Sequence, residues 1–302
     1  MLKVKAYAKI NLFLRVLGRR DDGYHEIVSV MQQLALHDTL ELWPEPGDRI
    51  RLETNAPGVP TGPDNLCMRA VMLGAQHTGI RKGLRIVLHK RIPVAAGLAG
   101  GSADAAATLM GLNHLWRLNL TKNELLDLGA AIGSDVPFCL LGGTALARGR
   151  GEELQPLLPA PQMGVVLVKA PFGLGAGKVY RHFDSLPSAA GADSEAILRS
   201  IQAQDVTGIA SCLVNDLQRV VFDLHPGLRQ VREDILRAGA LAALVSGSGP
   251  TLFGVTPDIR QAEEVGEKLR RKGRDVIVTT TASGGPQVHP VNPIVHSIPR
   301  QN

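Results

Sequence analysis

The sequence has few cysteines, and none of them are paired. Cys67, Cys139 and Cys212 are the three among 302 residues, and no two form a C-x-x-C pair. Their number and spacing exclude a disulfide framework and a zinc site built on cysteine pairs, and they favour a reducing compartment. None of the nine histidines stands in a spaced cluster with Cys or Glu. The residues therefore predict no protein-built metal centre, and any metal ligands stay unknown.

Long hydrophobic runs are also absent. The longest apolar stretches, Val136–Leu141 and Leu241–Val245, are far shorter than the ~18 residues that a membrane-spanning helix needs. The first residues contain no apolar signal core. We therefore expect a cytoplasmic protein that has no membrane partner.

Aromatic residues are scarce, at 4% of the chain, while 44% of residues are hydrophobic and 20% are charged. This composition is that of an ordinary globular protein, and 302 residues are enough for two domains. The net charge of +5 suits a polyanionic small substrate as well as nucleic acid. Because the basic residues are not interleaved with aromatic ones, we expect no nucleic-acid partner, although a basic nucleic-acid-binding module is the alternative from another class.

Two common phosphate-binding motifs are missing, but a third glycine-rich loop is present. The sequence contains no G-x-x-x-x-G-K-[ST], and its G-L-A-G-G spacing differs from G-x-G-x-x-G. The loop at 93–103 follows an alternating strand at 84–92 and leads into a helical pattern at 103–118. Its glycines permit φ > 0 and turn backbone N–H groups toward an anion, and the following helix adds the positive end of its dipole. The alternative is a turn that merely connects a strand to a helix.

Ser102 ends this loop and has three possible roles. Its hydroxyl can cap the helix, reach a phosphate or reach the metal of a nucleotide. The residues alone leave these roles open.

A regular alternation at 3–16 predicts a half-buried strand. Lys9 and Asn11 lie two residues apart on its second face, so they point the same way. A lone lysine on such a face is usually solvated, and that is the plain alternative to a functional role.

A polar turn ending in D-G-Y-H places Tyr24 and His25 before an apolar run at 27–36 and a strand at 38–43. An aromatic ring there can stack on a base, and an imidazole can hydrogen-bond to the edge of that base. Ordinary packing is the alternative.

Asp135 follows a helix that is well marked in the sequence. Thr121 and Glu124 form a capping box, and the apolar stripe continues to Ile132. Asp135 then stands in G-S-D-V-P, where it can cap the next helix or serve a site.

The second half predicts an antiparallel sheet covered by helices on one face. Strands are expected at 165–170, 242–245, 251–255 and 275–279, and helices at 194–204, 226–238 and 258–272. A second glycine-rich turn is expected at 173–180 and a hairpin-like turn at 246–250, whereas 282–302 has no periodicity and reads as a loose tail. The glycine- and proline-rich stretch at 149–161 puts a domain boundary near residue 155.

Five motifs occur together and in order, and their combination resembles the galactokinase, homoserine kinase, mevalonate kinase and phosphomevalonate kinase (GHMP) superfamily. They are K-I-N-L from Lys9, D-G-Y-H from Asp22, the loop 93–102, G-S-D-V-P from Gly133, and L-V-S-G-S-G-P from Leu244. The resemblance implies an α+β fold with two domains. These are a ribosomal-protein-S5-like domain at 1–155, which binds ATP and performs catalysis, and a C-terminal ferredoxin-like α/β sandwich at 156–282, followed by a flexible tail at 283–302.

Within the superfamily, D-G-Y-H is the most discriminating motif. With it, the sequence resembles the kinases that act on 4-diphosphocytidyl-2-C-methyl-D-erythritol. The resemblance implies ATP-dependent phosphorylation of the 2-hydroxyl of that compound, giving the 2-phosphate and ADP, in the non-mevalonate route to isoprenoids (terpenoids). ATP is the implied co-substrate and Mg²⁺ the implied ion. The protein would be a cytoplasmic monomer or weak homodimer.

The resemblance also implies roles for individual residues. Asp135 would accept the proton of the substrate hydroxyl, with Lys9 beside it. Asn11, Tyr24 and His25 would face the cytidine diphosphate, Tyr180 would stack on the opposite side of the cytosine, and the turn Gly247, Ser248 and Gly249 would close the site. The ATP phosphates would lie on Pro93, Val94, Ala95, Ala96, Gly97, Leu98, Ala99, Gly100, Gly101, Ser102 and Ala103.

Two positions depart from the pattern of these kinases. Ala103 stands where a second serine is common, so Ser102 alone offers a hydroxyl there, and no acidic residue identifies itself as a magnesium ligand. The segment before Tyr180 reads G-L-G-A-G-K, where the family usually has Ser or Thr with Pro.

Another kinase of the superfamily, or its diphosphomevalonate decarboxylase, is the competing enzyme interpretation. Tyr24 argues against it, because a base-stacking ring has no purpose for a substrate without a nucleobase.

Overall fold

The computed structural model describes residues 1–186 and 193–290, and its strands form two sheets. The first sheet has the order β12-β1-β2-β4-β3, with β5 paired to β2, β6 paired to β5, and β8 paired to β1. Its strands are β1 Leu2–Arg19, β2 His25–Glu45, β3 Ile50–Thr54, β4 Gly83–His89, β5 Thr144–Arg148, β6 Glu153–Pro156, β8 Val214–Asn215 and β12 Gln287–Pro290. Within the described ranges, no helix has the length and apolar character needed to cross a membrane.

Strand β1 alternates as expected at its start but is buried on both faces further along. Val4, Ala6 and Ala8 are fully buried, which confirms the predicted core face. The second face, expected to be at the surface, is also buried from Lys9 to Phe13. Parallel pairing of β8 with Phe13 and Leu14 brings the second half of the chain against this region.

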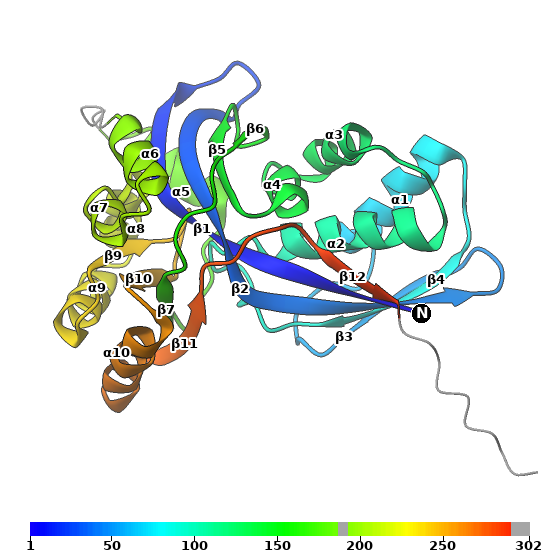
Figure 1. Cartoon of the computed structure of the whole chain (residues 1–302). Helices are drawn as coiled ribbons and strands as arrows, with labels where there is room; N and C mark the ends of the chain where they lie inside the picture. The colour runs from blue at the N-terminus through cyan, green and yellow to red at the C-terminus, as the bar shows by residue number, and fades with distance from the viewer. Residues whose placement is uncertain (187–192, 291–302) are drawn as a thin grey trace, which may run out of the picture.

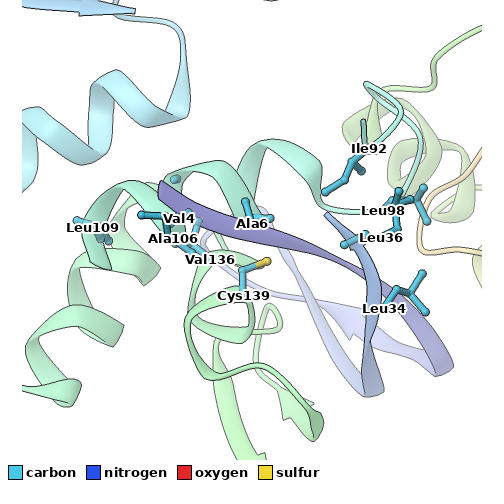
Figure 2. Packing of buried hydrophobic residues seen from close by; sticks show 14 of the residues in the cluster. Val4, Ala6, Leu34, Leu36, Ile92, Leu98, Ala106, Leu109, Val136 and Cys139 are labelled. Carbon is cyan, nitrogen blue, oxygen red and sulfur yellow. The ribbon is translucent and has the colours of Figure 1, made fainter. Parts of the chain in front are cut away.

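Four helices of the first half cover one face of this sheet (Figure 1). They are α1 Leu66–Thr78, α2 Gly100–Leu115, α3 Lys122–Ile132 and α4 Val136–Leu141. Alanines of α2 pack close to β1, and Figure 2 shows Ala106 beside Val4. Gly111 allows the same closeness, because a Cβ there would lie 2.1 Å from Leu42 Cδ1. The small residues of α2 therefore set its distance from the sheet.

The second sheet is antiparallel throughout, as predicted, with the order β11-β7-β10-β9. Its strands are β7 Gly164–Lys169, β9 Ala242–Val245, β10 Leu252–Thr256 and β11 Asp275–Thr280. The remaining helices are α5 Ala176–Phe183, α6 Glu195–Gln202, α7 Val206–Ser211, α8 Leu217–Leu224, α9 Gly227–Ala238 and α10 Ile259–Arg271. This strand order, with α8 and α9 before the β9–β10 hairpin and α10 after it, is ferredoxin-like. The predicted α+β class is confirmed.

The two halves share one core. Val166 and Val168 of β7 face the cluster that contains α9 and α10, whereas Val165 and Leu167 belong to the cluster of the first sheet and of α6. The second sheet is therefore buried on both faces, and one of these faces packs against the first half of the chain. The division into domains near residue 155 remains a prediction.

Two local predictions are wrong. Residues 287–290 were expected in a loose tail but form β12, which pairs antiparallel with Leu2–Lys5 beside the N-terminus (Figure 1). The last twelve residues, 291–302, lie outside the described part. The turn expected to extend to Tyr180 instead becomes helix α5 from Ala176, so Tyr180 lies on a helix.

Candidate active site

A cleft of about 410 Å³ lies between the glycine-rich loop and the second half of the chain. The residues at 93–97 and 99–102 line one wall, with Lys9 and Asp135 beside them. Gly247 and Ser248 of the β9–β10 turn line it from the other half. The structure therefore brings four of the five sequence motifs to one cleft.

The loop owes its shape to an alternation of left-handed residues. Ala95, Gly97 and Ala99 have φ values of 51°, 77° and 55°. The two alanines show that this backbone is adopted even where a Cβ makes it unfavourable. Gly97 allows no alternative, because a Cβ there would lie 2.1 Å from the carbonyl oxygen of Ser246. Such alternating backbones point N–H groups inward and form anion-binding concavities.

The start of α2 differs from the expectation. The helix begins at Gly100 after Ala99, which offers no side-chain cap, so Gly100 and Gly101 are helical and do not have positive φ. Ser102 is the third helical residue, so of its three possible roles the capping one does not hold. Among residues 1–186 and 193–290, no acceptor binds the N–H groups of Gly100, Gly101 and Ser102, so these groups can bind an anion, and the dipole favours negative charge there.

Lys9 is buried in the cleft floor and bound by polar groups. Its Nζ donates to Asn11 Oδ1 over 2.8 Å and lies 3.4 Å from Asp135 Oδ2. Asn11 Nδ2 donates in turn to Ser29 Oγ over 2.8 Å. The side chain of Lys9 is 5% exposed, so the solvated-face alternative does not hold.

Asp135 stands at the N-cap position of α4 but makes no capping hydrogen bond. Its side chain is 31% exposed and faces Lys9 instead. The capping alternative is therefore wrong, whereas the capping box predicted at Thr121 and Glu124 is confirmed. Asp135 is free to accept a proton from a group in the cleft.

The glycine turn of the second half touches these residues directly. A Cβ on Gly247 would lie 3.3 Å from Asn11 Oδ1 and 3.9 Å from Lys9 Nζ. Asn215 of β8 holds the turn, because its Nδ2 donates to the carbonyl oxygens of Val245 and Gly247, each over 2.8 Å. No pattern in the sequence predicts that Asn215 holds the turn, since Val245 and Gly247 lie at least 30 residues away from it.

A cluster of three rings, those of Tyr24, His25 and Tyr180, lies at the start of β2. His25 stacks on Tyr180 with ring centroids 4.7 Å apart and planes tilted by 28°. Tyr24 is 54% exposed, and the Arg150 guanidinium lies 4.9 Å from its ring centroid. Burial raises the pKa of Tyr180, and the nearby charge of Asp135 adds to that rise. Tyr180 therefore links this ring cluster to the surroundings of Asp135.

A buried ion cluster lies at the base of the glycine-rich loop. The sequence analysis did not predict it. Lys90 Nζ contacts Asp38 Oδ2 and lies 2.7 Å from Asp104 Oδ2, and all three side chains are at most 6% exposed. Burial raises the pKa of Asp104, the Lys90 charge opposes that rise, and Asp38 adds to it. Asp38 Oδ1 also accepts the N–H of Ile92, at the start of the loop. The cluster thus ties β2 and α2 to the base of the loop.

Comparison with known proteins places the chain in a family. Residues 49–143 match the description "GHMP kinases N terminal domain", and residues 197–275 match "GHMP kinases C terminal". The 4-diphosphocytidyl-2-C-methyl-D-erythritol kinase of Pelotomaculum thermopropionicum is 48% identical, over 91% of this chain and 96% of its own length. The enzyme of the same name from Moorella thermoacetica is 47% identical, over 93% and 99%.

Solved structures agree with these relatives. The crystal structure of a 4-(cytidine 5'-diphospho)-2C-methyl-D-erythritol kinase superimposes with a TM-score of 0.79 at 34% identity, covering 93% of this chain and all of the other. Homoserine kinase from Cytophaga hutchinsonii shares the fold, with a TM-score of 0.73 at 22% identity over 95% and 97% of the two chains. The chain therefore belongs to the GHMP kinases and, among them, to the family of 4-diphosphocytidyl-2-C-methyl-D-erythritol kinases.

Proposed function

We propose that the protein transfers the γ-phosphoryl group of ATP to the 2-hydroxyl of 4-diphosphocytidyl-2-C-methyl-D-erythritol, in the non-mevalonate route to isoprenoids. The observation that carries this proposal is the Asp135 carboxylate, 3.4 Å from Lys9 Nζ in the same cleft as the glycine-rich loop. The named relatives supply the substrate, and the ring cluster at Tyr24, His25 and Tyr180 fits its cytosine.

ATP is held by backbone groups. The left-handed residues of the loop and the free N–H groups of α2 bind the phosphates, and the dipole of α2 stabilises their charge. Transfer of a phosphoryl group depends mainly on such positioning and on charge stabilisation.

Asp135 accepts the proton of the substrate hydroxyl as its oxygen forms a bond to the γ-phosphorus. The bond between the γ-phosphorus and the bridging oxygen breaks, and ADP leaves with the bond electrons. Lys9 stabilises the ionised Asp135 and the negative charge that gathers at the transferred group. Asn11 and Gly247 fix the Lys9 amine, because the first accepts its hydrogen bond and the second covers it.

The cleft offers a magnesium ion only a few protein ligands, and a few are enough when the phosphates supply the others. The described residues hold no group of three His, Cys, Asp or Glu side chains suited to a metal. Magnesium in kinases is held by one or two carboxylates together with the substrate phosphates. Asp104 lines the cleft and has a buried Oδ1 without a hydrogen-bond partner, so it would hold the ion there, with the Ser102 hydroxyl on the same wall. The ion would neutralise phosphate charge.

We also propose a cytoplasmic protein, active as a monomer or weak homodimer. It would bind neither nucleic acid nor a membrane.

The proposal is tested by ADP release from ATP and Mg²⁺ with three alcohols: the cytidylated methylerythritol, mevalonate and homoserine. Turnover only with the first supports the proposed substrate. Turnover with another alcohol keeps the superfamily and overturns the assignment of Tyr24 and His25.

A further inference from the structure

Asp184 lies at the C-terminal end of α5 and contacts the first residue of β2. Its Oδ1 is 2.6 Å from His25 Nε2, a contact between residues 159 positions apart. The His25 side chain is 8% exposed and that of Asp184 is 32% exposed. An ionised carboxylate only accepts hydrogen bonds, so the proton between the two atoms resides on Nε2. The contact therefore favours the imidazole form that carries hydrogen on Nε2.

The same helix also fixes the plane of the imidazole. Tyr180 stands one helical turn before Asp184, whose N–H donates to the Tyr180 carbonyl oxygen over 3.1 Å. The Tyr180 ring stacks on His25 at a centroid distance of 4.7 Å. Helix α5 therefore holds His25 both by its ring face and by Nε2, which leaves the imidazole no freedom to flip.

The other ring nitrogen is available to a ligand. Within the described residues, no hydrogen bond is made by His25 Nδ1, and it is not among the fully buried unpartnered atoms. A neutral imidazole protonated on Nε2 presents Nδ1 as an acceptor. Cytosine carries an exocyclic amine, which donates, where uracil carries a carbonyl oxygen, which only accepts.

We propose that Asp184 is a positioning residue that keeps the proton of His25 on Nε2, so that Nδ1 accepts from the amine of cytosine and disfavours uracil. The inference rests on the proposed function, because it assumes that a cytidine diphosphate half occupies this end of the site. It makes Asp184 a determinant of base selectivity that does not itself touch the base.

The test compares wild type with Asp184→Asn, on the cytidylated substrate and on its uridine counterpart. An asparagine amide can donate to Nε2, which moves the imidazole proton to Nδ1. We expect KM for the cytidylated substrate to rise about tenfold, with kcat and KM for ATP each within about twofold, and the preference for cytosine over uracil to fall. Asp223→Asn is the matched control, because Asp223 pairs with Arg229 on an exposed surface.

A spectroscopic measurement separates this role from a merely structural one. Imidazole ¹⁵N shifts should show His25 protonated on Nε2 in wild type and in Asp184→Glu, and altered in Asp184→Asn. Unchanged selectivity and shifts in Asp184→Asn overturn the proposal, as does an equal loss of ATP and nucleotide-substrate affinity. If wild type fails to use the cytidylated substrate, the proposed function is wrong, and so is the proposed recognition of cytosine by His25. The shifts then decide only whether Asp184 sets the proton of His25.

Discussion

The Ser246 hydroxyl donates a hydrogen bond to the Gly97 carbonyl oxygen over 2.9 Å, joining the glycine turn of the second sheet to the glycine-rich loop of the first half. The carbonyl oxygen of Ser246 lies only 2.1 Å from the position that a Cβ on Gly97 would occupy. The two turns are thus packed backbone to backbone. The cleft keeps its width only while Gly97 carries no side chain at this contact.

Gly97→Ala should therefore widen or distort the cleft. The methyl group collides with backbone atoms, which cannot move away independently, and φ at this position is +77°. We expect KM for ATP to rise at least tenfold and the free energy of unfolding to fall by about 2 kcal/mol. Steady-state kinetics and urea unfolding measure the two effects.

Gly47→Ala is the control for this change. Gly47 has the same φ of +77° but nothing within 4 Å of a Cβ, so it carries only the backbone cost of about 1 kcal/mol. KM for ATP should not change. Equal effects of the two substitutions on KM would refute the role given to the Gly97 contact.

Lys90→Met should destabilise the protein strongly. It leaves Asp38 and Asp104 buried without their shared cation, and breaking a buried ion pair in this way costs about 3–5 kcal/mol. Lys169→Met is the control, since its 2.7 Å ion pair with Asp275 is exposed and is worth no more than about 1 kcal/mol. Chemical denaturation should separate the two variants, and similar midpoints would contradict this account of the cluster.

The Asp234 carboxylate contributes stability that depends on pH. Hydrogen bonds from Arg274, helped by Lys272 and Gln230, lower the pKa of Asp234 to about 2 despite its burial. A lowered pKa in the folded protein stabilises it above the ordinary value of about 3.9, and that stabilisation is lost as pH falls toward about 2.

Asp234→Asn should therefore remove about 1 kcal/mol at pH 7 and little at pH 2, with the figure reduced because Lys272 is half exposed. The comparison is made by denaturant unfolding at several pH values. A difference from wild type that stays constant from pH 7 to pH 2 would rule out this linkage.

Local patterns in the sequence predict the elements and the loop well. The alternation along the start of β1, the strand at 251–255, the capping box at Thr121 and the helix at 258–272 all correspond to structure within a few residues. These signals are local, because each depends on neighbours within one or two turns or on the pleat of one strand. The motifs shared with the superfamily also predict the cleft, because the fold of that superfamily brings the distant loops that carry them together.

The remaining features depend on contacts between distant segments. Lys9 is covered by the glycine turn at Gly247, more than 200 residues away in the chain, and no alternation pattern reveals this contact. The side chains of Asn215, Arg150 and Asp184 contact residues at least 30 positions away in the chain, so their local sequence carries no signal of these contacts. The strand at 287–290 likewise exists only because the free edge of β1 accepts it.

The central claim is that Asp135 accepts the proton of the substrate hydroxyl in the loop-bound ATP complex. Its most direct test is a single-turnover measurement of γ-phosphoryl transfer from labelled ATP to 4-diphosphocytidyl-2-C-methyl-D-erythritol, with wild type and Asp135→Asn. The account predicts a transfer rate at least ~10²-fold lower in the variant, with ATP affinity and stability unchanged. Transfer at the wild-type rate by Asp135→Asn would contradict it.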